Sequence, residues 1–132
     1  MKYLLDTNAV IALVNRRSAR LLERIREQEP DEVGLSVIVY HELYYGAFKS
    51  QRPAENLDTV DSLFFQAVEF TKEDAREAGE IRAHLARAGT PIGPYDVLIA
   101  AQARLRGLAL VTANTDEYAR VPGLRIENWM AS

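Results

Sequence analysis

Short apolar runs alternate with longer helical patterns along this 132-residue chain, and the alternation restricts the fold more than any other feature. The predicted strands cover residues 2–5, 33–35, 67–70, 108–111 and 124–127. Strands that alternate with helices favour an α/β fold with a mainly parallel central sheet and helices on both faces. We therefore expect one three-layer domain over residues 1–132, a length that can bury a sizeable core.

The segments between these strands have helical periodicity, and several carry start or stop residues. Ser36 is placed to cap a long helix, Thr71 and Asp74 form a capping-box pattern, and Gly89 and Gly107 are typical helix ends. The main apolar stripe of the long helix is predicted to be Val37, His41, Tyr44, Tyr45 and Phe48. The predicted helices cover residues 9–14, 18–28, 37–49, 53–66, 72–88 and 94–107.

Composition excludes some classes of site and leaves the partner open. The chain has no cysteine, which excludes disulfides, thiolate zinc sites and cysteine nucleophiles. No apolar run approaches the roughly 18 residues of a membrane span, and Asp6 comes too early for a signal peptide, so we expect a cytoplasmic protein. The net charge of −3 argues against a nucleic-acid partner, but sixteen lysines and arginines remain available for one.

Three carboxylates stand out because each is the only acid in an apolar segment. Asp6 follows the first predicted strand, Glu42 lies within the long helix, and Asp96 opens the helix that begins near Pro94. Each has a structural explanation when taken alone: a helix cap, a solvent-facing side chain and a favourable interaction with the helix dipole, respectively. Together they are predicted to meet at one edge of the sheet, where open parallel sheets bind ligands.

Clustered carboxylates repel one another, so such a site needs protonation or a bound cation. Mg²⁺ and Mn²⁺ prefer oxygen ligands and retain waters, one of which can become a nucleophile. Phosphodiester hydrolysis is the reaction that best suits this set. A fourth acidic contribution is expected from the polar corner after residue 111, where Asn114, Asp116 and Glu117 all qualify and the residues alone do not decide among them.

The order and spacing of these segments resemble the PIN-domain proteins, and among them the VapC toxins of VapBC toxin–antitoxin systems. The resemblance covers nearly the whole chain. It rests on the segments Leu4–Asn8, Glu42–Gly46, Ile92–Ala101, Leu110–Asn114 and Val121–Trp129.

This resemblance implies that Asp6, Glu42 and Asp96 are metal-binding catalytic acids, with Glu117 as the best match for the fourth. Asn114 departs from the pattern, because many PIN domains carry an aspartate there. The resemblance also implies an endoribonuclease toxin that cuts RNA, with transfer RNA as the expected substrate, and dependence on Mg²⁺ or Mn²⁺. It implies a homodimer and a VapB-type antitoxin, which would contact operator DNA in place of this chain.

Five basic residues are predicted to lie near the crevice and to contact RNA. Most such residues on helices are simply solvated. They are Lys49, Arg52, Arg82, Arg87 and Arg104.

Two alternative functions follow from the same residues. A phosphatase with Asp6 as nucleophile is disfavoured, because the common type needs a second aspartate where this chain has Asn8. A non-catalytic RNA-binding or scaffold module on the same fold would not require intact carboxylates at positions 6, 42 and 96.

Overall fold

The computed structural model describes residues 1–131. The strands are β1 (Tyr3–Leu5), β2 (Val33–Ser36), β3 (Gln66–Val68), β4 (Ala109–Val111) and β5 (Arg125–Glu127). The helices are α1 (Thr7–Val14), α2 (Ala19–Arg26), α3 (Val37–Lys49), α4 (Pro53–Asp61), α5 (Lys72–Ala88), α6 (Pro94–Arg106) and α7 (Thr115–Tyr118), with a short 3₁₀ turn at Pro30–Glu32.

The five strands form one sheet in the order β3-β2-β1-β4-β5, and every pairing is parallel. The central strand β1 pairs on both sides, with Tyr3 opposite Val33 on β2 and opposite Ala109 on β4. Because parallel strands end at the same edge, the residues that follow β1 and β4 are brought together there. Asp6 follows β1 and Thr112 follows β4 at this edge.

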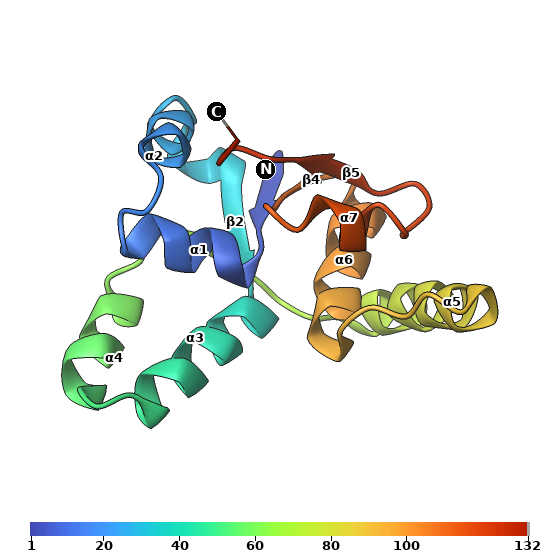
Figure 1. Cartoon of the computed structure of the whole chain (residues 1–132), viewed down its shortest axis with the longest axis horizontal. Coiled ribbons are helices and arrows are strands. Elements are labelled where there is room, and N and C mark those ends of the chain that lie inside the picture. The colour runs from blue at the N-terminus through green and yellow to red at the C-terminus, as the bar shows by residue number, and fades with distance from the viewer. Residues whose placement is uncertain (132) are drawn as a thin grey trace.

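Helices cover both faces of the sheet, which confirms the predicted three-layer α/β fold. Figure 1 shows α1 to α4 on one side of β1 and β2, and α5 to α7 on the other. The strand order accounts for this division. Right-handed crossovers that move from β1 to β3 place their helices on one face, and the return from β3 to β4 and β5 places its helices on the other.

The core lies between these layers and is almost entirely aliphatic. Leu4, Leu5, Leu35 and Leu110 on the strands are completely buried, as is Ile99 on α6. Strands covered on both faces lose the alternation of polar and apolar residues, because neither face meets water. This explains why the strands appear in the sequence as continuous apolar runs.

The predicted helix caps are confirmed. The Ser36 hydroxyl accepts a hydrogen bond from the Ile38 amide at the start of α3. At α5, Thr71 and Asp74 form a reciprocal capping box. Gly89 and Gly107 end α5 and α6 with positive φ angles of 73° and 66°, a conformation that glycine adopts without steric cost.

The predicted apolar stripe of α3 is wrong. Val39 belongs to the core, Ile38, Tyr40 and Leu43 pack against it, and Ala47 is also buried, whereas Tyr45 and Phe48 are 60% and 66% exposed. This helix is apolar almost all round, so periodicity alone could not select the buried face. The selection came from α4 and the sheet, against which α3 packs.

The predicted boundary between α4 and β3 is also wrong. The helix ends at Asp61, before the expected end near Gln66, and β3 spans Gln66–Val68. The connection is needed to carry the chain to the sheet edge, and it is held by Leu63 and Phe65, which pack against the core. Throughout residues 1–131, no helix combines the length and apolar character needed to cross a membrane.

Candidate active site

Asp6 is held at the end of β1 by hydrogen bonds to both of its carboxylate oxygens. The Ala9 amide donates to Oδ1 at 2.8 Å, so Asp6 caps α1, and the Thr112 hydroxyl donates to Oδ2 at 2.6 Å. The residue is only 3% exposed. Burial raises the pKa of Asp6, as do the charges of Glu42 and Glu117, while the hydrogen bonds from Thr112 and Ala9 oppose the rise.

Glu42 projects from α3 toward the start of α1. The Thr7 hydroxyl donates to Glu42 Oε1 at 2.8 Å. Thr7 and Asp6 are adjacent in the chain, so this contact ties the second acid to the first. The predicted solvent-facing explanation for Glu42 does not describe this geometry, because the side chain is partly buried and hydrogen-bonded across 35 residues.

Asp96 lies in the first turn of α6, where the Tyr118 hydroxyl donates to its Oδ1 at 3.0 Å. Burial raises the pKa of Asp96 to about 6, and the negative charges of Glu117 and Glu42 add to the rise, while the Tyr118 hydrogen bond opposes it. Gly93 leaves room for this carboxylate, because a Cβ at position 93 would lie 2.8 Å from Asp96 Oδ2.

Among the three candidates for the fourth acid, Glu117 is the one that interacts with the other acids and with the segment before Asp96. Its Oε1 accepts from the Gly93 amide at 3.0 Å, and its Oε2 accepts from the Asn114 side-chain amide. Its charge raises the pKa of both Asp6 and Asp96. Asn114 therefore supports Glu117, and Asp116 is exposed on the same short helix. The geometry favours Glu117, and its catalytic role stays a prediction.

The charges of Glu42 and Glu117 act on both Asp6 and Asp96, and none of the four acids forms an ion pair within residues 1–131. Their partners are hydroxyl and amide groups, which are dipoles with no net charge. Burying carboxylates in this way costs free energy unless a positive charge is supplied. The arrangement therefore suits a bound cation.

The chemistry of the donor set fits Mg²⁺ or Mn²⁺, although the residues do not enclose an ion by themselves. Within residues 1–131, no three acidic or histidine side chains are gathered closely enough to hold one. Mg²⁺ does not require such an enclosure, because it commonly binds one or two carboxylates and completes its shell with water and substrate phosphate oxygens. Because all of these ligands are oxygen atoms, the site does not favour metals that prefer thiolate ligands.

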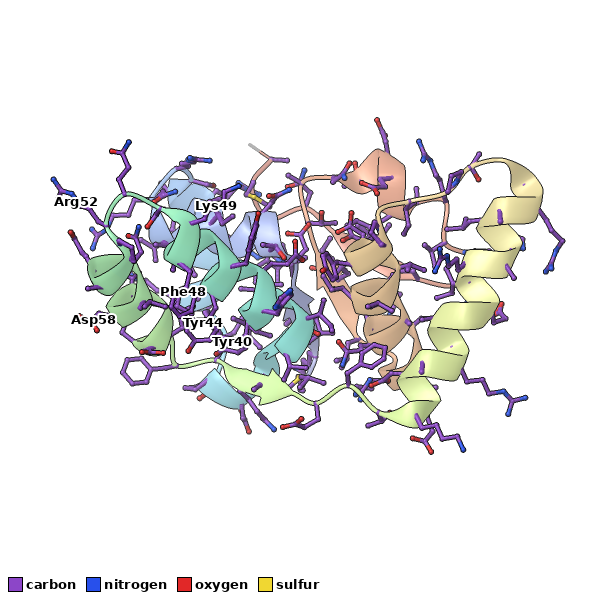
Figure 2. All side chains as sticks on the ribbon, turned by 90° about the horizontal axis from the view of Figure 1, so that it is seen from below. Tyr40, Tyr44, Phe48, Lys49, Arg52 and Asp58 are labelled. Atoms are coloured by element: carbon purple, nitrogen blue, oxygen red, sulfur yellow. The ribbon has the colours of Figure 1, made fainter. Side chains whose placement is uncertain are left out.

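The basic residues predicted to contact RNA lie in different surroundings. Figure 2 shows Lys49 and Arg52 at the end of the α3–α4 hairpin, remote from α6, and Arg52 pairs with Glu55 at 3.4 Å. Arg82 on α5 borders cavities that Pro94 also lines.

The other two predicted RNA contacts lie farther along the chain. Arg87 is in the last turn of α5. Arg104 pairs with Glu77 at 2.7 Å and with Glu80 at 2.5 Å, and it also donates to the Pro122 carbonyl. Its charge is thus compensated within the fold, which gives no support to an RNA contact at this position.

Sequence reasoning missed the hydroxyl donors at the site. Thr7 directly follows Asp6 and Thr112 directly follows β4, so a search for hydroxyls beside the acids and strand ends would have found them. Tyr118 had no such signal, because it lies in a helix of four residues that the periodicity did not predict. Burial and the neighbouring carboxylates of Asp96 and Asp6 raise the pKa of Tyr118, so the phenol keeps its proton.

The curated relatives of this chain are named as endonucleases or ribonucleases. A family model described as PIN domain matches residues 3–124. The tRNA(fMet)-specific endonuclease VapC of Salmonella typhimurium is 40% identical over 131 residues, which cover 98% of both chains. The tRNA(fMet)-specific endonuclease VapC of Shigella flexneri is 42% identical over 132 residues, again covering 98% of both.

Solved structures give the same result. The DNA-bound VapBC of Salmonella typhimurium aligns with a TM-score of 0.93 at 40% identity, over 98% of each chain. VapBC-1 from nontypeable Haemophilus influenzae aligns with a TM-score of 0.90 at 30% identity, over 99% of this chain and 100% of the other. The chain therefore belongs to the PIN-domain family, and within it to the VapC ribonucleases.

Proposed function

We propose that this chain is the toxin of a VapBC-type pair and a metal-dependent endoribonuclease that hydrolyses a phosphodiester bond in transfer RNA. The observation that carries the proposal is one sheet edge at which the charges of Glu42 and Glu117 act on Asp6 and Asp96, with no ion pair to any of the four acids from residues 1–131. The relatives named as tRNA(fMet)-specific endonucleases support the choice of substrate.

In this proposal, Asp6, Glu42 and Asp96 would hold Mg²⁺ or Mn²⁺ partly through bound water, and Glu117 would complete the acidic edge. When bound, the cation supplies charge stabilisation for the reacting phosphate and lowers the pKa of an attacking water. The chain's own contribution is to orient the acids. Thr112, Thr7 and Tyr118 each donate one hydroxyl to one acid, and these donors leave the carboxylates charged and in fixed positions.

The two alternative functions fit these contacts less well. A phosphatase of the common type needs a second aspartate two residues after its nucleophile, and this chain has Asn8 at that position. A non-catalytic RNA-binding module has no use for buried acids whose mutual repulsion raises the pKa of Asp6 and Asp96.

The decisive experiment is RNA cleavage by the purified chain in Mg²⁺, Mn²⁺ or EDTA. We expect wild type to cut transfer RNA with either metal and not in EDTA. Asp6→Asn, Asp96→Asn and Glu117→Gln are each expected to lose about a hundredfold or more in rate. Asp116→Asn is the matched control, because Asp116 is an exposed acid one residue from Glu117, and it should cleave at the wild-type rate.

Two outcomes contradict the proposal. Cleavage that persists in EDTA removes the metal from the mechanism. Binding of transfer RNA without cleavage under any of these conditions favours the non-catalytic module.

A VapB-type antitoxin is the proposed partner. We expect one segment of the antitoxin to occupy a groove between α1, α3 and α4. The groove has a volume of about 270 Å³. Glu42 lies on its wall, so a bound segment would come next to a catalytic acid and could block substrate. Its apolar lining includes Ile11, Val14, Leu43, Val60 and Leu63.

The same proposal includes a cytoplasmic homodimer and contact with operator DNA through the antitoxin. The similar VapBC complexes that were solved with bound DNA support the contact between the complex and operator DNA. A gel-shift experiment with operator DNA should show no binding by the chain alone and binding by the complex, while light scattering of the chain alone should give the mass of a dimer.

A further inference from the structure

Tyr118 is a core residue that reaches the candidate active site. It is the last residue of α7, its side chain is 1% exposed, and its ring belongs to the core cluster. Its hydroxyl group lies 3.0 Å from Asp96 Oδ1. The contact joins α7, which follows β4, to the first turn of α6, so it connects two segments separated by 22 residues.

The surroundings of Asp96 differ from those of Asp6. Two donors, from Ala9 and Thr112, hold the two oxygens of Asp6. For Asp96, the Tyr118 hydroxyl is the one side-chain or backbone donor to the carboxylate that is found among residues 1–131. When Asp96 and Glu117 are both ionised, the orientation of the Asp96 carboxylate therefore depends on this one donor.

The other oxygen of Asp96 faces the space that Gly93 leaves open. A Cβ on Gly93 would lie 2.8 Å from Oδ2, and this is the nearest atom that it would meet. The Tyr118 hydroxyl thus restrains Oδ1, while Oδ2 lies close to Gly93, whose amide holds Glu117. The Asp96 carboxyl group also interacts with the Glu117 carboxyl group, an acid that cannot donate to it when both are ionised.

We propose that Tyr118 is a positioning residue, whose hydroxyl holds Oδ1 of Asp96 so that Oδ2 is oriented to bind the divalent cation. The inference rests on the proposed metal-dependent function. Partners that orient metal-binding side chains typically change metal affinity or activity by about 10- to 100-fold when they are removed. Tyr118 acts through Asp96, and it does not itself touch the cation.

The test compares Tyr118→Phe with wild type by Mn²⁺ titration calorimetry, RNA cleavage kinetics and thermal melting. Phenylalanine keeps the ring in the core and removes only the hydroxyl. We expect Mn²⁺ affinity to fall about tenfold, and kcat at a fixed Mn²⁺ concentration to fall while KM for RNA is unchanged. A loss of stability alone would not change Mn²⁺ affinity measured well below the melting temperature.

Tyr40→Phe is the matched control. The Tyr40 hydroxyl donates to the Phe65 carbonyl at 2.9 Å, so this variant loses a hydrogen bond of similar length that has no connection to the acids. It should bind Mn²⁺ and cleave RNA as wild type does. Tyr118→Phe placed in an Asp96→Asn background should produce no further loss of Mn²⁺ affinity, because the proposed effect passes through Asp96.

The outcomes separate this inference from the proposed function. Wild-type Mn²⁺ affinity in Tyr118→Phe, or an equal loss in the Asp96→Asn background, overturns the positioning role and leaves the metal-dependent nuclease intact. Wild-type protein that neither binds Mn²⁺ nor cleaves RNA overturns both.

Discussion

Two aspartates at helix starts, Asp74 and Asp96, have opposite electrostatic surroundings, and Asp74 is buried whereas Asp96 is half-buried. Asp74, at the start of α5, is completely buried and pairs with Arg106, whose guanidinium lies 2.6 Å from Oδ1 and 3.0 Å from Oδ2. Asp96, at the start of α6, receives only the Tyr118 hydroxyl. Both lie in the first turn of a helix, so the helix dipole favours both alike and does not explain the difference.

The pKa values of the two groups follow from their partners. Burial raises the pKa of Asp74, but the hydrogen bonds from Arg106 and Thr71 outweigh it, and the net pKa is lowered. Burial raises the pKa of Asp96 to about 6, and the neighbouring acids add to the rise. Asp74 is neutralised by an arginine of the same chain, which indicates a structural role. Asp96 has no such partner in the described part of the chain, and a carboxylate with a raised pKa and no internal cation indicates a functional site.

The largest effect is expected when the arginine that pairs with Asp74 is removed. Arg106→Ala leaves Asp74 buried without a positive partner and should lower the free energy of unfolding by about 3 kcal/mol. Urea denaturation measures this. The control is Arg52→Ala, which breaks the exposed pair with Glu55 and should change the same free energy by less than about 0.5 kcal/mol. If both variants lost the same free energy of unfolding, the pair of Asp74 with Arg106 would contribute no more than an exposed ion pair, and the comparison with Asp96 would fail.

The next effect concerns the position of the Asp96 carboxylate, which has no cationic partner within residues 1–131. Gly93→Ala places a Cβ against Asp96 Oδ2, and because that oxygen ends a movable side chain, it can shift at little cost in stability. We expect RNA cleavage to fall about tenfold, since a misplacement of about 1 Å can cost about a hundredfold. Gly79→Ala, in the middle of α5 with no atom within 4 Å of the added Cβ, is the control and should leave cleavage unchanged. Unchanged cleavage by Gly93→Ala would mean that Asp96 Oδ2 is not needed where it lies.

A smaller effect is the pH dependence of stability, to which Asp96 and Asp74 contribute with opposite signs. Asp96 has a folded-state pKa of about 6, above the unfolded value near 3.8, so the folded state binds the proton more tightly. Its protonation therefore stabilises the fold, and in EDTA the melting temperature should rise as the pH falls from about 7.5 to about 5.

The matched variant for this pH experiment is Asp96→Asn, in which the rise should be smaller. Asp74 has the opposite sign. Its pKa is lowered, so its contribution to stability is present above pH 3.8 and is lost as the pH falls through its folded-state pKa. A melting temperature that is the same at both pH values for wild type and variant would contradict the raised pKa of Asp96.

The smallest effect extends the comparison from acids to arginines. Arg82 forms no ion pair within residues 1–131 and borders the cavities beside Pro94, whereas Arg104 is paired with two glutamates. Arg82→Ala should weaken RNA binding and reduce the slope of log affinity against log salt by roughly 0.7 to 0.9. Arg104→Ala should lower stability and leave that slope unchanged. Filter binding over a range of salt concentrations checks both.

Much of the fold was predictable because local chemistry agrees with it. The capping residues Ser36, Thr71 and Gly107 act within a few residues of their own positions, so their effects can be deduced from neighbours in the chain. The buried face of α3 was not predictable in this way. That helix has apolar residues on nearly every side, and only its packing against α4 and the sheet selects Val39 and Ala47 for burial.

The candidate site shows the same division. Asp6, Glu42 and Asp96 were identifiable as single acids in apolar segments, and a parallel sheet predicts that the strand ends meet at one edge. The fourth acid was left open among Asn114, Asp116 and Glu117, because three polar residues at one corner are equivalent until the turn is known. In the structure, the amides of Gly93 and Asn114 hold Glu117, while Asp116 faces solvent.

The parallel α/β architecture, the helix caps and the three principal acids of this VapC-group protein could all be predicted from its residues. These features depend on residue type and short-range spacing. Only the tertiary structure decided which acids are paired and which are not, since Asp74 and Arg106 are 32 residues apart and Tyr118 and Asp96 are 22 apart. The state of a carboxylate depends on the charges and dipoles around it in space, and its neighbours in the chain do not specify them.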